Sequence, residues 1–432
     1  MDSPNVRLDG QLRALILQEC QLVMGCTEPA MIALAAAHAS RLASEPPDRI
    51  LVTVSTGVYK NARFVGLPGL DHKGIDVAAA IGWAIGMPEL GLQILNGLTD
   101  ERRDSAERLL RDRRVVIEKT LEHEGLYVHV RANTRSHVVE TSIEGCHDNV
   151  SFVSLDGVRV QITAHGGDRL PLCSLQSYSF VEILEAVSSM DLAGLRFLAD
   201  GARANLTLAR AALEGECKDA LPGLSSALQQ VASRTPSSIH ADVHALAAAA
   251  VSARMAGTRR PVLTCAGSGN QGLLVSIPVC VFYDSQQRTS ESENDQPFLR
   301  ALLLAHSVNL FLKAYTGVIS ALCGAVTGGA GVAAAVCALS GGTQQQIANA
   351  VLAVLGSLYG MLCDGAKGSC AFKISSGALE GLIAGMLAVR GAAIGPGNGL
   401  LSVSVDETAS RLGSLTRDVL NRADNLVLDM RE

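Results

Sequence analysis

Three cysteines in the last third of the chain could bind one metal centre. Cys363 and Cys370 are the two ends of the segment Cys-Asp-Gly-Ala-Lys-Gly-Ser-Cys, and Cys323 lies upstream, near the start of a run rich in glycine and alanine. Glycine lets a backbone turn sharply and approach a second segment closely. An iron–sulfur cluster needs three or four thiolates that converge. The spacing differs from the ferredoxin pattern, so a zinc site or plain buried thiols also fit these residues.

Cys26 is a fourth candidate, because it precedes a segment that should begin a helix. Thr27 suits an N-cap, and Glu28 and Pro29 suit the first turn of a helix running to about Ala43. A helix N-terminus lowers the pKa of a nearby thiol. Cys26 is therefore a candidate reactive thiolate, and a buried structural cysteine is the alternative.

Two further segments could bind a small ligand. Residues 50 to 56 read as a strand that runs into the loop 57–61, where Lys60 offers an ammonium group and Asn61 an amide; a surface turn is the alternative. The second segment, Gly267-Ser268-Gly269-Asn270-Gln271-Gly272, matches the G-x-G-x-x-G pattern of dinucleotide sites.

The dinucleotide interpretation of that pattern is weak, because it requires a long following helix and an acidic residue farther on. Pro278 should break such a helix, and the acidic residues at the required distance fall in a polar loop. The exposed N–H groups of such a turn still form a nest for an anion. Ser268, Gly269 and Asn270 are therefore candidates for binding a carboxylate.

The composition limits the class of protein. The chain has 432 residues, of which 48% are hydrophobic but only 3% aromatic, and 42 are glycine. Such a core packs by close approach of helices, and the length suggests two domains. The net charge of −6, without an extended basic run, argues against nucleic acid as a partner. Eleven cysteines, an odd number, and an N-terminus without a signal-peptide pattern predict a reducing cytoplasm.

The segment 314–340 carries no charge and is long enough to cross a membrane. We expect a buried pair of helices instead, because glycine and alanine are weakly apolar and residues 327–331 interrupt the run. The segment also lacks an aromatic belt. The sequence therefore predicts no membrane partner.

The chain as a whole predicts an α+β fold. A mainly helical domain rich in alanine and glycine should comprise residues 1–47 and 167–432, and a smaller α/β domain with an antiparallel-rich sheet should comprise residues 48–166. The expected strands are 50–56, 115–119, 126–132, 136–143, 149–155 and 158–164. The expected helices include 77–85, 182–187, 192–213, 224–232 and 241–256.

Taken together, the motifs resemble the L-cysteine desulfidase family, which is related to the iron–sulfur L-serine dehydratases through their alpha-chain domain. The resemblance rests on Gly-Cys-Thr-Glu-Pro-Ala at 25–30, Tyr-Lys-Asn at 59–61, the 267–272 turn, Cys323 and the 363–370 segment. The relation to the serine dehydratases covers mainly the residues from about 260 onward. In those enzymes a longer Cys-Asp-Pro loop replaces 363–370, so the assignment of Cys370 depends on the desulfidases.

The resemblance implies an oxygen-sensitive 4Fe-4S enzyme that converts L-cysteine to pyruvate, ammonia and sulfide. It implies Cys323, Cys363 and Cys370 as the cluster ligands and Cys26 as the proton acceptor; a fourth-ligand role for Cys26 stays open. The expected partner is a small amino acid, whose carboxylate Ser268, Gly269 and Asn270 would hold with help from Lys60 and Asn61; a homo-oligomer is compatible with this picture. An L-serine or L-threonine dehydratase is the first alternative, and a non-catalytic metal or redox sensor is the second.

Overall fold

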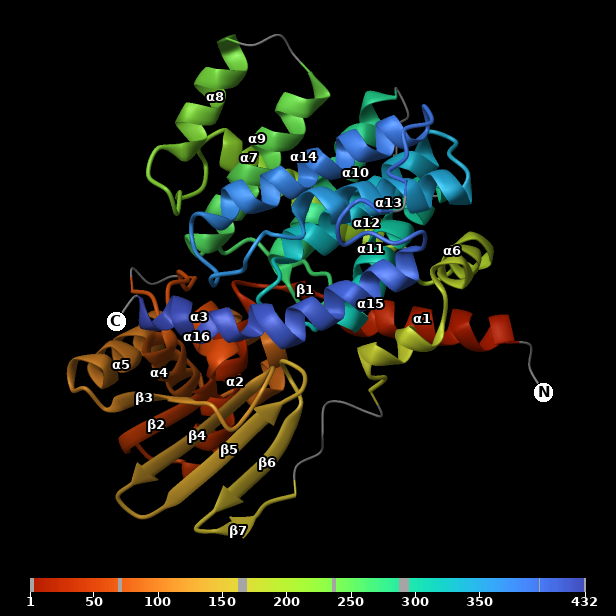
Figure 1. The fold of residues 1–432 in the computed structure, drawn as a ribbon. Coiled ribbons are helices and arrows are strands. Elements are labelled where there is room, and N and C mark those ends of the chain that lie inside the picture. The colour runs from red at the N-terminus through yellow and green to blue at the C-terminus, as the bar shows by residue number, and fades with distance from the viewer. Residues whose placement is uncertain are drawn as a thin grey trace.

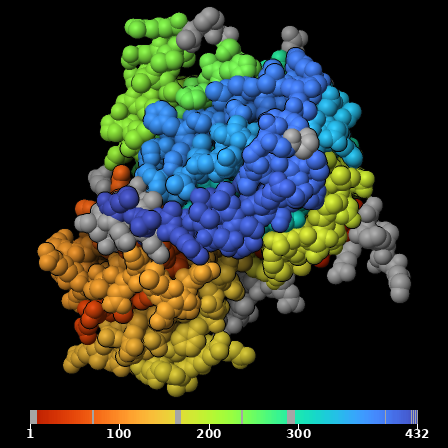
Figure 2. All heavy atoms as spheres, in the orientation of Figure 1, coloured from red at the N-terminus to blue at the C-terminus, as the bar shows by residue number. Residues whose placement is uncertain are grey.

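The computed structural model describes residues 4–68, 72–161, 169–234, 238–286, 295–395 and 397–430. Figure 1 shows a β-sheet with its covering helices at one end of the molecule and a larger set of helices at the other. Each part has its own core of buried apolar residues. In Figure 2 the dark blue C-terminal segment lies between the orange sheet part and the helices above it.

The sheet has six strands in the order β3-β2-β4-β5-β6-β7. The β2–β3 pair is parallel, and the other pairs are antiparallel. The mixed α+β class is therefore confirmed. The strands are β2 Pro47–Ser55, β3 Val115–Thr120, β4 Tyr127–Thr134, β5 Val138–Glu144, β6 Val150–Leu155 and β7 Val158–Arg159. The strand predicted at 158–164 is thus shorter in the structure, and part of the prediction lies outside the described residues.

Two alanine-rich helices cover one face of this sheet: α2 Thr27–Ala43 and α4 Ile75–Ile85. Alternate residues of the strands, such as Val128 and Val130, are buried beneath them. The helices approach so closely that a Cβ at Gly82 would lie 2.0 Å from the carbonyl oxygen of Ala33. The predicted boundary at residue 47 assigns α2 to the other domain, whereas α2 shares the apolar core of the sheet. The division into domains stays a prediction.

Residues 57–61, predicted as a loop, form most of the short helix α3 Thr56–Ala62. Ser55, at the end of β2, caps this helix by accepting a hydrogen bond from the Val58 N–H at 3.5 Å. The surface-turn alternative is also wrong, because Lys60 is only 1% exposed. Because we predicted that the strand continues to residue 56, we did not identify Ser55 as the N-cap of α3.

The larger part is helical, with a two-stranded ribbon in which β1 Leu22–Val23 pairs antiparallel with β8 Val262–Leu263. Its α-helices are α1 Pro4–Glu19, α6 Phe180–Ser189, α7 Phe197–Leu213, α8 Leu224–Arg234, α9 Ile239–Met255, α10 Gly269–Ser285, α11 Gln296–Thr316, α12 Gly324–Leu339, α13 Gln344–Leu358, α14 Cys370–Ala388, α15 Val405–Leu415 and α16 Asn421–Asp429. The sheet part also contains α5 Asp100–Arg111 and the helical segment η1 Pro88–Gly97, and two short helical segments lie at Leu172–Ser177 and Thr416–Leu420.

The helix α10 passes through Pro278, where we predicted a break. Ser268 caps its start by accepting a hydrogen bond from the Gln271 N–H at 3.4 Å. Burial of nearly the whole helix compensates for the backbone hydrogen bond that proline removes. The dinucleotide interpretation still fails, because the strand before the turn has two residues and pairs antiparallel instead of belonging to a parallel βαβ unit.

The helix α12 lies at the centre of the helical part, in contact with α10, α11, α13 and α14. Nearly all its residues are buried, as expected for the uncharged segment. The expected pair of helices within 314–340 is wrong, because α12 runs unbroken through 327–331 and α11 ends at Thr316. By length and composition, α14 could cross a membrane, as could α4 and η1 if that bent pair were one span. Half of the apolar stretch of α14 is buried inside the protein.

The packing of α12 against α14 depends on glycine. A Cβ at Gly381 of α14 would lie 2.4 Å from the carbonyl oxygen of Gly329 in α12. We expect Gly381→Ala to lower the free energy of unfolding by about 1–3 kcal/mol, because the helices must move apart. Urea unfolding measures this change. The control is Gly360→Ala, where a Cβ would meet no atom within 4 Å; equal midpoints for the two variants would contradict the prediction.

Candidate metal and substrate site

Most of the candidate residues meet at one cavity of about 90 Å³. The cavity wall includes seven of them: Cys26, Asn61, Ser268, Asn270, Cys323, Cys363 and Cys370. Gly269 and Lys60 lie directly behind this wall. A Cβ at Gly269 would meet the guanidinium group of Arg254, another wall residue, and the Lys60 ammonium contacts the backbone of Cys363. The residues come from both ends of the chain and from its middle.

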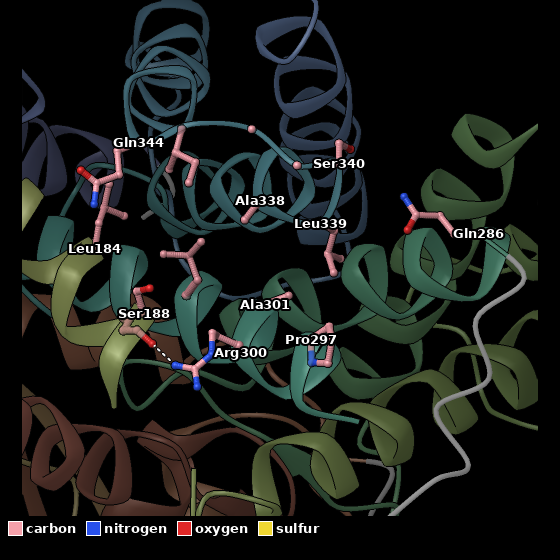
Figure 3. Close-up of a pocket in the computed structure, with 15 residues that line it drawn as sticks. Leu184, Ser188, Gln286, Pro297, Arg300, Ala301, Ala338, Leu339, Ser340 and Gln344 are labelled. Carbon is pink, nitrogen blue, oxygen red and sulfur yellow. Dashed lines mark hydrogen bonds between the residues drawn. The ribbon is translucent and has the colours of Figure 1, made fainter. Parts of the chain in front are cut away.

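A larger cavity, of about 840 Å³, lies elsewhere in the helical part, between α6, α11 and the loop before α13 (Figure 3). Its wall contains no cysteine, and its one charged residue, Arg300, donates a hydrogen bond to the carbonyl oxygen of Val187. Because its lining offers no titratable group other than this arginine, we place the chemistry at the smaller cavity.

The three cysteines of the last third are brought together by backbone contacts between two loops. The Cys323 N–H donates to the carbonyl oxygen of Met361 at 2.9 Å, and the Cys363 N–H donates to that of Ala321 at 2.7 Å. Cys370 is the first residue of α14, at the end of the same loop. Gly365 has a φ of +97°, and a Cβ there would lie 2.3 Å from the carbonyl oxygen of Lys60. This loop therefore requires glycine at 365.

Four helix N-termini converge on the cavity. Cys26, Ser268 and Cys323 are the N-cap residues of α2, α10 and α12, and Cys370 begins α14. The unpaired N–H groups and the dipole at each helix start favour negative charge. The arrangement suits thiolates, a carboxylate or an anionic cofactor.

Burial outweighs this effect for the thiols themselves. Burial, and after it the neighbouring Cys363, raise the pKa of Cys323 to about 12. The pKa of Cys370 is also raised, chiefly by burial. The charge of one thiolate disfavours ionisation of its neighbours, so these thiols are not expected to lose their protons together unless a cation lies among them. A bound metal ion removes the protons of its thiol ligands, so the donor set fits an iron–sulfur centre.

The lowered pKa that we predicted for Cys26 is not found. Burial raises the pKa of this thiol to about 12, although the Arg254 guanidinium opposes the shift. The Cys26 thiol donates a hydrogen bond to the Glu28 carboxylate at 3.4 Å, which further stabilises the protonated form. The helix begins one residue earlier than predicted, with Cys26 in place of Thr27 as the N-cap, and the prediction could not include the burial of Cys26 or the orientation of Glu28.

Lys60 supports the cysteine loop instead of facing the cavity. Its Nζ donates to both carboxylate oxygens of Asp424 at 2.8 Å and to the carbonyl oxygen of Cys363 at 3.0 Å. These contacts occupy its three N–H donors, so we do not carry its substrate-binding role forward. Asn61 does face the cavity, and its amide donates to Glu28 at 2.9 Å.

Two buried cations in the cavity wall, and the half-buried Lys373, were missed as site residues by the sequence analysis. Arg254 is 2% exposed and donates to the Asn270 side chain at 2.9 Å and to the carbonyl oxygen of Gly25 at 3.1 Å. Its Nε is buried without a partner among the described residues. Lys313 is also buried; burial lowers its pKa to about 8. The signal in the sequence is an isolated cation in an otherwise apolar helix, which is rare unless the charge has a function.

These features define a buried, thiol-rich cavity whose residues fit a metal centre. The serine dehydratase alpha chain model matches residues 89–429, and the chain belongs to this family. A UPF0597 protein of Moorella thermoacetica is 39% identical over 410 residues, which cover 95% of this chain and 94% of the relative. One of Desulfatibacillum aliphaticivorans is 32% identical, with 94% of each chain covered. The name of these relatives specifies no reaction, whereas the family is one of lyase-type enzymes associated with iron–sulfur centres.

The Lys60–Asp424 pair gives a prediction for the site. We expect Asp424→Asn to lower the free energy of unfolding by about 3–5 kcal/mol, because the buried Lys60 ammonium loses its counter-charge. Burial raises the pKa of Asp424 although Lys60 opposes this, so urea unfolding should be measured near pH 8, where the carboxylate is ionised.

The matched control is Asp418→Asn, an exposed carboxylate on the same C-terminal segment, which should change the free energy by less than about 0.5 kcal/mol. An Asp424→Asn protein as stable as the control would show that the ion pair does not hold the C-terminal segment in place.

Proposed function

We propose that this protein is an iron–sulfur lyase that catalyses α,β-elimination from L-cysteine, giving pyruvate, ammonia and hydrogen sulfide. The observation that carries the proposal is the meeting of Cys26, Cys323, Cys363 and Cys370 at one cavity that also contains Arg254 and Lys313. Membership of the serine dehydratase alpha chain family supports a lyase. All eleven cysteines are free thiols, in keeping with the reducing cytoplasm that we propose as its location.

Cys323, Cys363 and Cys370 would hold a 4Fe-4S cluster. With three protein ligands, such a cluster offers one iron as a Lewis acid, which makes the substrate sulfur a better leaving group. Lys60 fixes the Cys363 backbone, and Gly365 allows the loop its turn. The Lys373 ammonium lies near these thiols and lowers the pKa of Cys323 in opposition to burial, so it stabilises their charged form.

The turn before α10 would bind the substrate carboxylate. The N–H groups of Gly267 and Ser268 already donate to the carbonyl oxygens of Glu19 and Cys265, so the carboxylate would meet the N–H groups of Gly269 and Asn270, which begin α10 and have no acceptor within the helix. The Ser268 hydroxyl uses its oxygen to accept from the Gln271 N–H, and its own O–H remains available to donate. Arg254 orients the Asn270 amide and adds a positive charge behind the turn. Asn61, which also lines the cavity and donates to Glu28, would assist in binding the carboxylate.

Cys26 would take the α-proton. Its thiol holds a proton in the present surroundings, so the thiolate requires the positive charge that a metal centre and Arg254 place beside it. Loss of the β-substituent then gives aminoacrylate, which tautomerises and hydrolyses in water to pyruvate and ammonia. The second role, a fourth cluster ligand, also uses the thiolate but keeps it bound to iron.

The first experiment is an anaerobic assay of the full chain after reconstitution with iron and sulfide. We expect sulfide and pyruvate in equal amounts from L-cysteine, and a smaller rate of pyruvate formation from L-serine and L-threonine. Cys363→Ala should lose most of its iron and all turnover, whereas Cys337→Ala, which removes a buried thiol outside the cavity, should keep both.

A higher rate with serine or threonine would favour the dehydratase, which the family match makes the second candidate. Iron without turnover of any of the three amino acids would favour a non-catalytic sensor. Full iron content in Cys363→Ala would overturn the assignment of the ligands.

The role of Cys26 is tested by Cys26→Ser. If Cys26 is the proton acceptor, this substitution should reduce cysteine turnover by about 100-fold or more and leave the iron content unchanged. Turnover and iron are measured on the same anaerobic preparation. Loss of iron in step with activity would instead assign Cys26 as a ligand, and unchanged turnover would exclude both roles.

A further inference from the structure

A second group of metal-binding side chains lies next to the cavity. Cys20 follows α1, Cys265 lies between β8 and α10, and His306 lies within α11. Their ligand atoms all lie within 4.8 Å of one another, and the Cys20 Sγ is 3.2 Å from the His306 Nδ1. All three side chains are buried. We propose that Cys20, Cys265 and His306 bind a single thiophilic metal ion, of the Zn²⁺ type, at a site separate from the iron–sulfur centre.

The spacing of the three ligand atoms favours one ion over a cluster. Ligands of a single zinc lie about 2.0–2.3 Å from the metal, so they lie within about 4 Å of one another. Ligands of a cluster bind different irons and stand farther apart. Two thiolates and one imidazole are also a donor set that soft or borderline ions prefer.

The hydrogen bonding around the group also suits a metal-bound thiolate. Asn309 donates from its Nδ2 to the Cys265 Sγ at 3.1 Å. A metal ion removes the protons of the thiols that bind it, and it supplies the counter-charge that a thiolate in the protein interior needs.

Polar atoms around the group lack partners. The His306 Nε2, the Ser307 Oγ and the Asn309 Oδ1 are buried without a hydrogen-bond partner among the described residues. Buried polar atoms are rarely left unsatisfied, and a metal ion on the Nδ1 of His306 would fix the tautomer whose Nε2 carries the proton. The His306 Nδ1 already faces the two sulfurs.

The proposed ion would stabilise the wall of the neighbouring cavity. The Cys265 N–H donates to the carbonyl oxygen of Ser268, and the Ser268 N–H donates to that of Cys265. Asn309 connects the Cys265 sulfur to the Gln271 side chain, which lines the cavity. Fixing Cys265 therefore fixes the turn before α10.

The test counts zinc and iron separately in the full chain, purified anaerobically and analysed by mass spectrometry of the elements. We expect about one zinc per chain in addition to the iron. Cys20→Ser should lower the zinc content about 10-fold or more and leave the iron in place. Cys363→Ala should show the reverse, and Cys280→Ser, which removes another buried thiol, should keep both metals.

Three results would overturn the proposal. One is less than about a tenth of an equivalent of zinc in the wild-type chain after incubation with Zn²⁺; another is full zinc content in Cys20→Ser. The third is a Cys20–Cys265 disulfide in the metal-free protein, found by mass spectrometry after trapping of free thiols. If Cys20→Ser does not fold, reconstitution of the wild-type chain with Co²⁺ replaces it: thiolate-to-cobalt absorption supports the site, and its absence contradicts it. Because turnover is not measured, failure here leaves the proposed lyase activity untouched.

Discussion

The close parallel packing of α12 and α14 is the constraint on which the cavity lined by the four cysteines depends. A Cβ at Gly377, Gly381 or Gly385 would collide with the carbonyl oxygen of Ala325, Gly329 or Ala333, respectively. Each step of four residues along one helix corresponds to four along the other in the same direction, so both helices begin at the same end. Cys323 and Cys370 stand at these two beginnings. The glycines inside the helices thereby place two of the proposed iron ligands at one end of the pair.

This arrangement sets two electrostatic effects against each other. Four helix starts favour negative charge in the cavity, but burial keeps the thiols protonated and raises the pKa of Cys26 and Cys323 to about 12. A helix start contributes about 0.3–1 kcal/mol in exposed settings, whereas burial of an unpaired charge costs more. The helix starts alone therefore do not make reactive thiolates. A bound cation shifts the balance, because it lowers the cost of ionising several thiols together.

The sequence analysis selected candidate residues that line one cavity, but it did not predict what surrounds them. Candidates from motifs far apart in the chain line one cavity. They could be selected because cysteine, serine and asparagine are residue types that bind metals or carboxylates. Three features that the sequence analysis missed depend on tertiary packing. They are the helical conformation of residues 56–62, the continuation of α10 through Pro278 and the ion pair of Lys60 with Asp424. Local propensity is a weak guide where burial supplies the stabilisation. Cys20, Cys265 and His306 show no spacing pattern, since they come from three separate elements.

The buried cations complete the electrostatic argument. Thiolates around a metal centre and a substrate carboxylate would together place several negative charges in a small volume. Arg254 and Lys313 lie in the same wall, and they donate to carbonyl and side-chain amide oxygens. Arg254 also contacts the Cys26 thiol. The Glu28 carboxylate in this wall offsets part of the positive charge, because His147, Asn61 and Arg254 together hold its pKa below the ordinary value against burial. The nearby Glu28 carboxylate is held by the Asn61 amide and the Cys26 thiol. Two buried cations against one carboxylate leave the wall net positive beside protonated thiols, and this charge favours the anionic substrate that we propose.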